Sequence, residues 1–358
     1  MAQKETISSI NQVVKEKPKK KRIWEIDFIR GVAILGMCVD HLLWDLGNLN
    51  SFFFNYRTVD ISWVNQMGVA LREWYAGGRQ YFHNLAFLFF IICGISSTFS
   101  RNNWKHSLKI FLASLVLFIG TYGLYHISYM VDPHGALDFR ICFGVLYALA
   151  MGTLFVSIIP SLCHLVMVGV EKIEETIKKK KGQEYTRKEI DKKPSFTKWI
   201  YLGLGLSLIV SWIIVTYTVL YPAKGIQYDS FSSWWYYWIR KYDAAPYVYL
   251  VSPAQAKDGW TAFFGLSFSD FMLSLVGLRS MGSDFFSLIP WVGWTLIGAF
   301  LGETVYKKKE SLLPKLDGKW NKPFAWAGNQ SLWIYVFHQV VWVILIAIVF
   351  CPMGYRFF

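Results

Sequence analysis

The sequence is poor in cysteine, and none of its cysteines is arranged to hold a metal. Its 358 residues include five cysteines, and no two of them form a Cys-x-x-Cys pair. All five lie in or beside apolar segments, where a free thiol behaves as a small hydrophobic side chain. The sequence therefore predicts neither a disulfide framework nor a metal site.

Other absences narrow the chemistry further. The chain lacks a Gly-rich phosphate-binding loop, a Ser-centred nucleophile elbow and a His-Glu-x-x-His sequence. ATP hydrolysis and metalloprotease chemistry lose support on these grounds. No pair of carboxylates at helical spacing indicates glycoside hydrolysis, and no repeat recurs at a fixed period.

Apolar residues, by contrast, are abundant. They make up 54% of the chain, aromatic residues make up 18%, and the mean hydropathy is +0.31. A soluble domain has too little interior for this load, so the composition predicts an all-α polytopic membrane protein. About seven runs are long enough to cross roughly 30 Å of hydrocarbon. The predicted spans are Phe28–Leu46, Tyr81–Phe99, Leu108–Tyr125, Ile141–Met167, Ile200–Tyr221, Phe285–Leu301 and Ser331–Phe350.

The spans are predicted to form one transmembrane domain over residues 23–358, after a disordered basic tail over residues 1–22. The first apolar run carries Arg30, Asp40 and His41 and has no small-residue cleavage site, so it does not read as a secretory signal. Residues 222–284 form an aromatic region between spans. Within it, Thr261–Leu278 is too polar for a confident span and fits a short interfacial or re-entrant helix.

The net charge of +13 reflects membrane orientation rather than nucleic-acid binding. Positive charge accumulates on the cytoplasmic side of membrane proteins. The basic residues gather in the N-terminal tail, at Arg101 and Lys105, in a loop over residues 171–198, and between Lys307 and Lys322. All four regions fall on one side of a seven-helix zigzag. We therefore expect a multi-pass protein of the cell membrane with a cytoplasmic N-terminus, whose basic loop also meets anionic lipid.

A charged stripe on the first span is the most informative feature. Arg30 and His41 are eleven residues apart, which places them on one face of a helix about 16 Å apart along its axis. Asp27 lies one turn before Arg30, and Asp45 one turn after His41. Charges cost roughly 2.5–3.5 kcal/mol each in hydrocarbon, so the stripe must face protein or water. It forms either a functional channel or a buried ionic network that fixes helix packing.

These residue types suit group transfer at a membrane. A guanidinium such as Arg30, with Asp27 beside it, can hold a phosphate in a bidentate way. His41 can act as a general base, because an imidazole has a pKa of about 6.5. Asp45, or Asp40 on a neighbouring face, would orient that imidazole as a carboxylate does in a catalytic triad.

The last span adds His338 and Gln339, which are polar groups near the bilayer centre and need partners there. His338 can reach the same cavity as His41, and Gln339 suits an interhelical hydrogen bond or a substrate contact. Trp235, in the aromatic region, either packs at the interface or stacks on a sugar-like acceptor.

Five blocks, in order, resemble one known family. They are Arg22–His41; Phe87–Ser96; Phe143–Tyr147; Ser283–Gly293 with Gly298–Gly302; and Gly328–Gln339. Together they resemble the catalytic domain of the heparan-α-glucosaminide N-acetyltransferases, in the bacterial branch of that family. The Arg30–His41 spacing also resembles the Arg-x10-His pattern of transmembrane acyltransferases. Two positions depart from the family pattern, since Tyr147 stands in place of histidine and Val340 in place of proline.

The resemblance implies a membrane acyltransferase that takes acetyl-CoA from the cytoplasm and acylates a carbohydrate hydroxyl or amine on the far side. Together with the charged stripe, it leads us to expect His41, Asp45 and His338 as catalytic residues and Arg30 with Asp27 as the donor site. Gln339, Trp235 and Trp291, the last in the Pro-Trp-x-Gly block, would contact the acceptor. Direct transfer and an acyl-histidine intermediate both remain open. The alternatives are a small-molecule or proton-coupled transporter, since intramembrane Asp, Arg and His also build proton relays, and a non-catalytic envelope scaffold.

Overall fold

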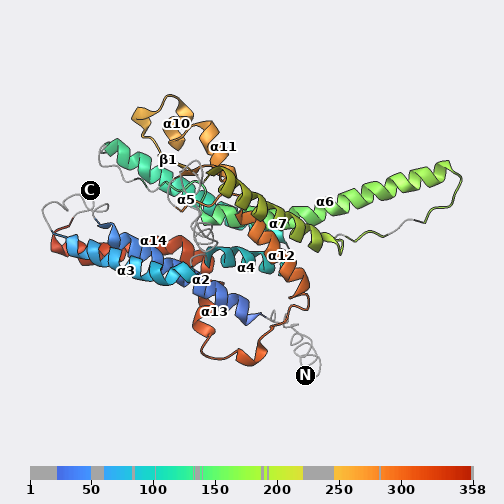
Figure 1. The fold of residues 1–358 in the computed structure, drawn as a ribbon, viewed down its shortest axis with the longest axis horizontal. Coiled ribbons are helices and arrows are strands. Elements are labelled where there is room, and N and C mark those ends of the chain that lie inside the picture. The colour runs from blue at the N-terminus through green and yellow to red at the C-terminus, as the bar shows by residue number, and fades with distance from the viewer. Residues whose placement is uncertain are drawn as a thin grey trace, which may run out of the picture.

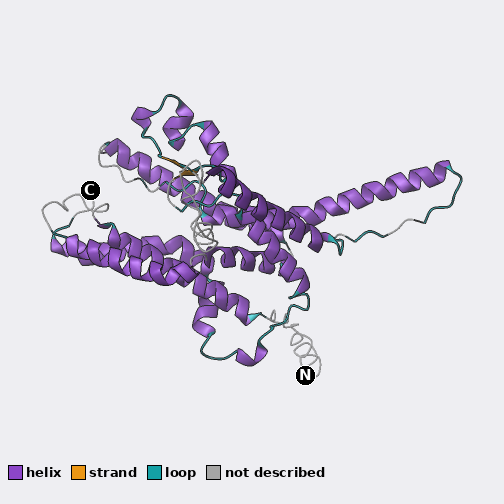
Figure 2. Cartoon of the chain, viewed as in Figure 1, coloured by secondary structure: helices purple, strands orange, loops and turns teal. Residues whose placement is uncertain are grey.

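The computed structural model describes residues 22–49, 60–82, 85–100, 102–131, 133, 138, 140–186, 189–191, 193–220, 246–281 and 284–355. The predicted basic tail before Arg22, and Trp235, lie outside these residues. In the described part of the chain the fold is almost wholly helical, as the composition predicted (Figure 2).

The first half of the chain contains long helices. These are α2 (Trp24–Gly47), α3 (Ser62–Phe82), α4 (Leu85–Phe99), α5 (Asn103–Val131), α6 (Val145–Lys180) and α7 (Thr197–Val215), which continues as a π-helical turn, η2 (Thr216–Leu220).

The second half is more broken. It contains β1 (Tyr247–Val248), η4 (Pro253–Gln255), α10 (Gly259–Phe264), α11 (Phe268–Val276), β2 (Ser280–Met281), α12 (Trp291–Thr304), η5 (Pro314–Leu316), α13 (Lys322–Asn329), α14 (Ser331–Phe350) and η6 (Cys351–Met353). The strands β1 and β2 pair in parallel, with Tyr247 opposite Ser280.

Four helical segments of the described chain are long and apolar enough to cross a membrane. They are Asn103–Val131, Val145–Lys180, Thr197–Leu220 and Ser331–Met353. The predicted count of about seven spans is not confirmed. The helix α2 has the length of a span but carries several charged side chains, and α4 and α12 have only 15 and 14 residues.

Several predicted boundaries need correction. The predicted span Tyr81–Phe99 is the shorter α4, and the amphipathic helix α3 before it was not predicted. The helix α6 continues past Pro160 to Lys180, so residues 171–180 are helical where a basic loop was predicted. Glu174–Lys178 and Glu175–Lys179 ion pairs at i,i+4 spacing support this last part of the helix. Two short helices, α10 and α11, occupy most of Thr261–Leu278.

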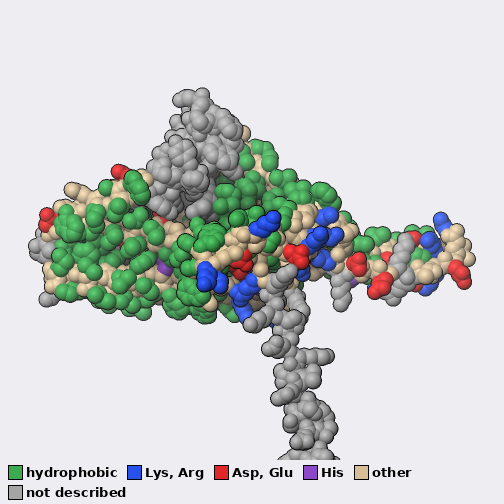
Figure 3. All heavy atoms as spheres, turned by 90° about the horizontal axis from the view of Figure 1, so that it is seen from below, with side chains coloured by type: hydrophobic (Ala, Val, Ile, Leu, Met, Phe, Trp, Pro, Cys, Tyr) green, Lys and Arg blue, Asp and Glu red, His purple; other side chains and the backbone are tan. Residues whose placement is uncertain are grey.

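The helices form two groups that meet near the middle of the molecule. In Figure 1, α2, α3 and α14 run side by side in one group, and α4, α5, α6, α7 and α12 pack together in the other. Hydrophobic side chains cover the first group, and Lys and Arg gather near the middle of the same face (Figure 3). The helix α14 exposes large apolar side chains such as Ile344 and Ile348. A broad apolar surface of this kind suits contact with lipid.

Glycines allow the closest helix contacts. A Cβ added to Gly31 of α2 would lie 1.8 Å from the carbonyl oxygen of Phe324 in α13, and one added to Gly328 would lie 1.9 Å from that of Asp27. Small residues let helix backbones approach closely in membrane proteins. This contact sets the position of α13, which leads directly into α14.

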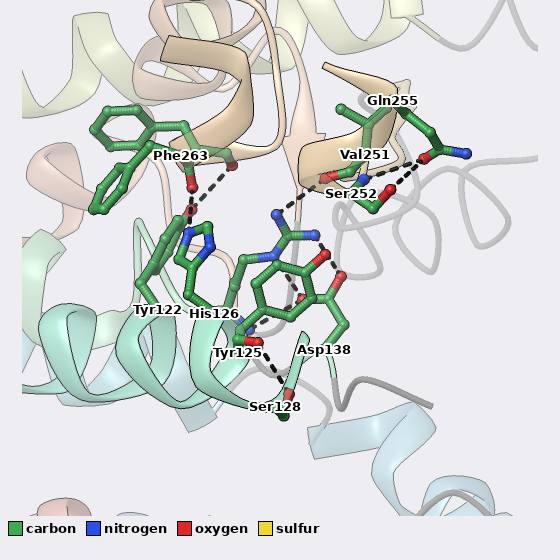
Figure 4. A network of polar contacts seen from close by, with 11 residues as sticks. Tyr122, Tyr125, His126, Ser128, Asp138, Val251, Ser252, Gln255 and Phe263 are labelled. Carbon is green, nitrogen blue, oxygen red and sulfur yellow. Dashed lines mark hydrogen bonds and ion pairs between the residues drawn. The ribbon is translucent and has the colours of Figure 1, made fainter. Parts of the chain in front are cut away.

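A buried arginine fastens residues 246–281, which we term the cap segment, to α5. The Arg140 side chain is fully buried, and it donates to both carboxylate oxygens of Asp138 and to the carbonyl oxygen of Val251. Its guanidinium lies 3.8 Å from the centre of the Tyr125 ring. Nearby, the Tyr122 hydroxyl donates to the Phe264 carbonyl oxygen, and His126 contacts that of Phe263 (Figure 4). These bonds hold the cap segment over the end of α5.

Candidate functional site

The helix α2 carries the predicted stripe. Arg30 is half-buried and forms an ion pair of 3.3 Å with Asp27, and its Nη2 donates to the Ser96 hydroxyl of α4 at 2.5 Å. These two contacts involve two of the five N–H groups that a guanidinium carries. The helix α2 therefore presents Arg30 at its contact with α4, with Asp27 as an ion-pair partner, as expected from the sequence.

Two further basic residues, His106 and Lys109, lie in the first turns of α5. His106 is near enough to both Arg30 and Lys109 for their charges to act on its ring. Neither residue was predicted from the sequence, since neither lies on the α2 stripe. The cations Arg30 of α2 and Lys109 of α5 therefore both lie in the surroundings of one imidazole, where an anion would be attracted.

The predicted histidines of α2 and α14 are in direct contact. His338 Nε2 lies 2.8 Å from His41 Nδ1, and their ring centres are 4.9 Å apart. Both side chains are half-buried. The sequence placed His338 near the bilayer centre and within reach of the cavity that holds His41, and the structure brings the two together across 297 residues of chain.

The hydrogen bonds assign the tautomers of this pair. His338 Nδ1 lies 2.6 Å from the backbone oxygen of Tyr335, which can only accept, so Nδ1 carries the proton. In the neutral ring, His338 Nε2 then accepts from His41 Nδ1–H. This arrangement places the lone pair of His41 on its Nε2 atom, which is the basic atom of the pair.

Two more contacts join α2 to α14 beside the histidines. The Gln339 amide donates to the buried carboxylate of Asp45 at 2.8 Å, and the Trp342 indole donates to the Cys38 carbonyl oxygen at 2.9 Å. The interhelical role predicted for Gln339 is thus present. Asp45, expected to orient His41, is bound by an amide one residue from His338, so the two polar pairs lie side by side on the same helices.

Asp284 and Tyr335 extend the cluster and were not selected from the sequence. The Tyr335 hydroxyl donates to Asp284 Oδ2, and the same carboxylate accepts from the backbone N–H of Val145 at the start of α6. Asp284 stands just before an apolar run, where a single carboxylate gives little signal. It lies within the block Ser283–Gly293 that resembles the family, but nothing in that block singled it out.

Of the two predicted aromatic contacts, Trp291 lies among the described residues. Trp291 is 2% exposed and stacks on Phe90 with ring centres 4.6 Å apart, in the core that surrounds the start of α12. Tyr147, at the position where the family pattern has histidine, packs with Phe143 in an apolar cluster under the cap segment. Trp291 is packed in the same core as Tyr335, and its contact with an acceptor stays a prediction.

No group of three His, Cys, Asp or Glu side chains that could hold a metal ion occurs among the residues that the structure describes. The basic atom of His41 and the cationic group around Arg30 are instead the chemical features of α2. His41 suits proton transfer and Arg30 suits anion binding, and the two residues are about 16 Å apart along the helix.

One comparison with known proteins gave a match. Searches of curated proteins and of solved structures gave no match. A family model described as heparan-alpha-glucosaminide N-acetyltransferase, catalytic, matches residues 22–173 and 196–340, which include α2, α4, α12 and nearly half of α14. Since this match covers most of the chain, the protein belongs to the heparan-alpha-glucosaminide N-acetyltransferase catalytic-domain family.

Proposed function

We propose that the protein transfers an acetyl-type group from cytoplasmic acetyl-CoA to a hydroxyl or amine of a carbohydrate on the other side of the membrane. Membership of a membrane acetyltransferase family supports the class of reaction. The observation that carries the proposal is the direct contact of His41 with His338, on the helix that also presents Arg30.

The donor end of the site is built around Arg30. CoA carries several phosphates, and a guanidinium binds phosphate through parallel N–H bonds. Asp27 and Ser96 hold the guanidinium in place, while Lys109, which also acts on the His106 ring, adds a second positive charge. With the phosphates at Arg30, the extended pantetheine arm runs along α2 toward His41.

The acyl-transfer end is built around His41 Nε2. This atom takes the proton of the acceptor hydroxyl or amine as the acceptor oxygen or nitrogen attacks the thioester carbonyl carbon. The C–S bond then breaks, and the departing thiolate takes the proton from the imidazolium. His338 Nε2 accepts from His41 Nδ1–H, so it stabilises the charged ring at the moment when the proton is held there.

An acyl-histidine route uses the same atom. In that case His41 Nε2 attacks the thioester directly, and the acyl group then passes to the acceptor. Both routes need the His41 ring to hold one orientation. The bond from Gln339 to Asp45 fixes α14 against α2 one turn from His41, which is how Asp45 contributes to either route.

The charge distribution supports an orientation with the N-terminus in the cytoplasm. The basic residues Lys178–Lys181 form the last turn and the C-cap of α6, whose end projects away from the α2–α3–α14 group (Figure 1). An excess of Lys and Arg is typical of cytoplasmic segments. This orientation puts Arg30 on the side from which acetyl-CoA arrives and the cap segment on the acceptor side.

The test uses the full chain purified and reconstituted into vesicles. With [14C]acetyl-CoA and a panel of glucosamine-containing saccharides, we expect CoA release and labelled saccharide only when both substrates are present. His41→Ala should lower the rate by at least about 100-fold, which is the usual contribution of a general base. His164→Ala, a histidine of α6 far from the cluster, is the matched control and should keep the wild-type rate.

Two results would contradict the proposal. Failure of the wild-type protein to bind acetyl-CoA at high micromolar concentration would favour a transporter or scaffold. Near-normal transfer by His41→Ala would remove His41 from the mechanism.

A further inference from the structure

Asp284 occupies an unusual place for a carboxylate. It lies in the turn before α12 with a φ of 51°, a left-handed conformation that Asp tolerates better than most residues. Its carboxylate receives the Tyr335 hydroxyl from α14 and the Val145 N–H from α6, and its charge acts on the His338 ring. One side chain thus joins the start of α6 to the helix that carries His338.

Tyr335 connects this carboxylate to the histidines through two different atoms. Its hydroxyl donates to Asp284, and its backbone oxygen accepts from His338 Nδ1. The next bond in the series is the contact of His338 with His41. A continuous path of contacts therefore runs from Asp284 through Tyr335 and His338 to the basic atom of His41.

We propose that Asp284 is a positioning residue that acts through Tyr335 on the His338–His41 pair and supplies the negative charge that stabilises this pair when it takes up a proton. The proposal rests on the transfer function proposed above and assigns a role to a residue outside the α2 stripe. Asp284 does not itself touch the reacting atoms, so its role is separate from that of His41.

The physical reason is the location of the charge. A proton held by two half-buried imidazoles is stabilised by a nearby fixed countercharge, because charges interact more strongly inside a protein than in bulk water. Other titratable groups near the pair in the described chain include Cys38, Asp40 and Asp45 on α2 and Tyr335 on α14. Of the carboxylates, Asp45 is bound by Gln339, whereas Asp284 is connected to His338 itself.

The substitution Asp284→Asn separates the effect of the negative charge from the effect of the hydrogen bonds that the side chain makes. An asparagine oxygen can accept from the Val145 N–H and the Tyr335 hydroxyl, and Asn caps helices as well as Asp does. The variant therefore keeps the turn and removes only the negative charge. Asp258→Asn is the matched control, since Asp258 is an exposed carboxylate that caps α10 in the cap segment.

The readout is the charge state of the histidines, measured without any transfer reaction. Diethyl pyrocarbonate modifies the neutral imidazole, so its reaction with His41 and His338, followed by mass spectrometry across pH, gives the midpoint of protonation. We expect Asp284→Asn to lower this midpoint by about 1 pH unit, the usual effect of losing an opposite charge nearby. Asp258→Asn should leave it unchanged.

The substitution Tyr335→Phe provides a second test of the role of Asp284. It removes the hydroxyl but keeps the backbone oxygen that fixes the His338 tautomer. We expect a smaller downward shift of the midpoint, and no further shift when it is combined with Asp284→Asn, because both changes break the same path. If Asp284→Asn fails to fold, the Tyr335→Phe shift alone decides the proposal.

The outcomes separate this proposal from the proposed function. An unchanged midpoint in Asp284→Asn, or in Tyr335→Phe where the first variant does not fold, overturns the role of Asp284 whatever the transfer activity. A shifted midpoint in a protein that transfers no acetyl group leaves the coupling standing and overturns the function. If the coupling and the transfer activity are both present, the acid limb of the pH profile of acetyl transfer should shift in Asp284→Asn by the same amount as the protonation midpoint of the histidines.

Discussion

Replacement of Gly328 by alanine tests whether the α2–α13 contact positions the site. The added Cβ would lie 1.9 Å from the carbonyl oxygen of Asp27, whereas ordinary contacts begin near 3.4 Å. The backbone oxygen cannot rotate away, so α13 must withdraw from α2 by about 1.5 Å to restore a normal contact. The same movement is transmitted to α14, because Gln330 alone separates the two helices.

The displacement has two measurable consequences. Overpacking of this kind costs about 1–3 kcal/mol in the free energy of unfolding. It also moves Tyr335 and His338 relative to His41, and a misplacement of about 1 Å can lower a rate by roughly 100-fold. We therefore expect Gly328→Ala to be less stable in detergent and to transfer acetyl groups much more slowly.

Gly120→Ala is the matched control. Gly120 lies within α5, and a Cβ there would meet nothing within 4 Å, so the change should be neutral or stabilise the helix by up to about 1 kcal/mol. The assays are thermal unfolding in detergent and acceptor-dependent release of CoA. If Gly328→Ala unfolds at the wild-type temperature with wild-type activity, the close approach of α13 to α2 is not as described.

Three further predictions concern separate contacts. Arg140→Gln should lower the free energy of unfolding by about 2 kcal/mol, because the bonds to Asp138 and Val251 are lost. It should also speed amide hydrogen exchange in the cap segment, and unchanged exchange would contradict the fastening role. Arg30→Lys keeps the positive charge but loses the planar guanidinium that can hold a phosphate through two N–H groups. The KM for acetyl-CoA should therefore rise about tenfold, with a smaller effect on the KM for the acceptor. Equal effects on the two KM values would argue against a phosphate contact. A double-mutant cycle of Asp45→Asn and Gln339→Leu should give a coupling of about 0.6 kcal/mol in unfolding, and strict additivity would mean that the bond does not form.

Local patterns predicted the helices that are uniformly apolar. Ser331–Phe350 was predicted with the same bounds that the structure shows for α14, because the run is strongly apolar apart from a few polar residues such as His338 and Gln339. The helix α3 was missed since its sequence is amphipathic and polar on average, so a search for long apolar runs passes over it. The end of α6 was misjudged because its lysines suggested a loop, although the i,i+4 acidic partners that support a helix are visible in the sequence.

The site was partly predictable for a related reason. Helical spacing placed Arg30 and His41 on one face of α2 and indicated that His338 needed a polar partner. Spacing within one helix cannot show which residues of another helix are met, so the pairing of Gln339 with Asp45 appears only in the structure. Asp284 is recognisable only once Tyr335, 51 residues away, is seen to donate to it.

The central claim is that His41 and His338 act as one unit, and a rate comparison of three variants tests it most directly. Acceptor-dependent acetyl transfer is measured for His41→Ala, His338→Ala and the double variant under the same conditions. Groups that act together give strongly non-additive losses. We predict that the double variant is no slower than His41→Ala alone, whereas a loss equal to the product of the two single losses would show that the two histidines work independently.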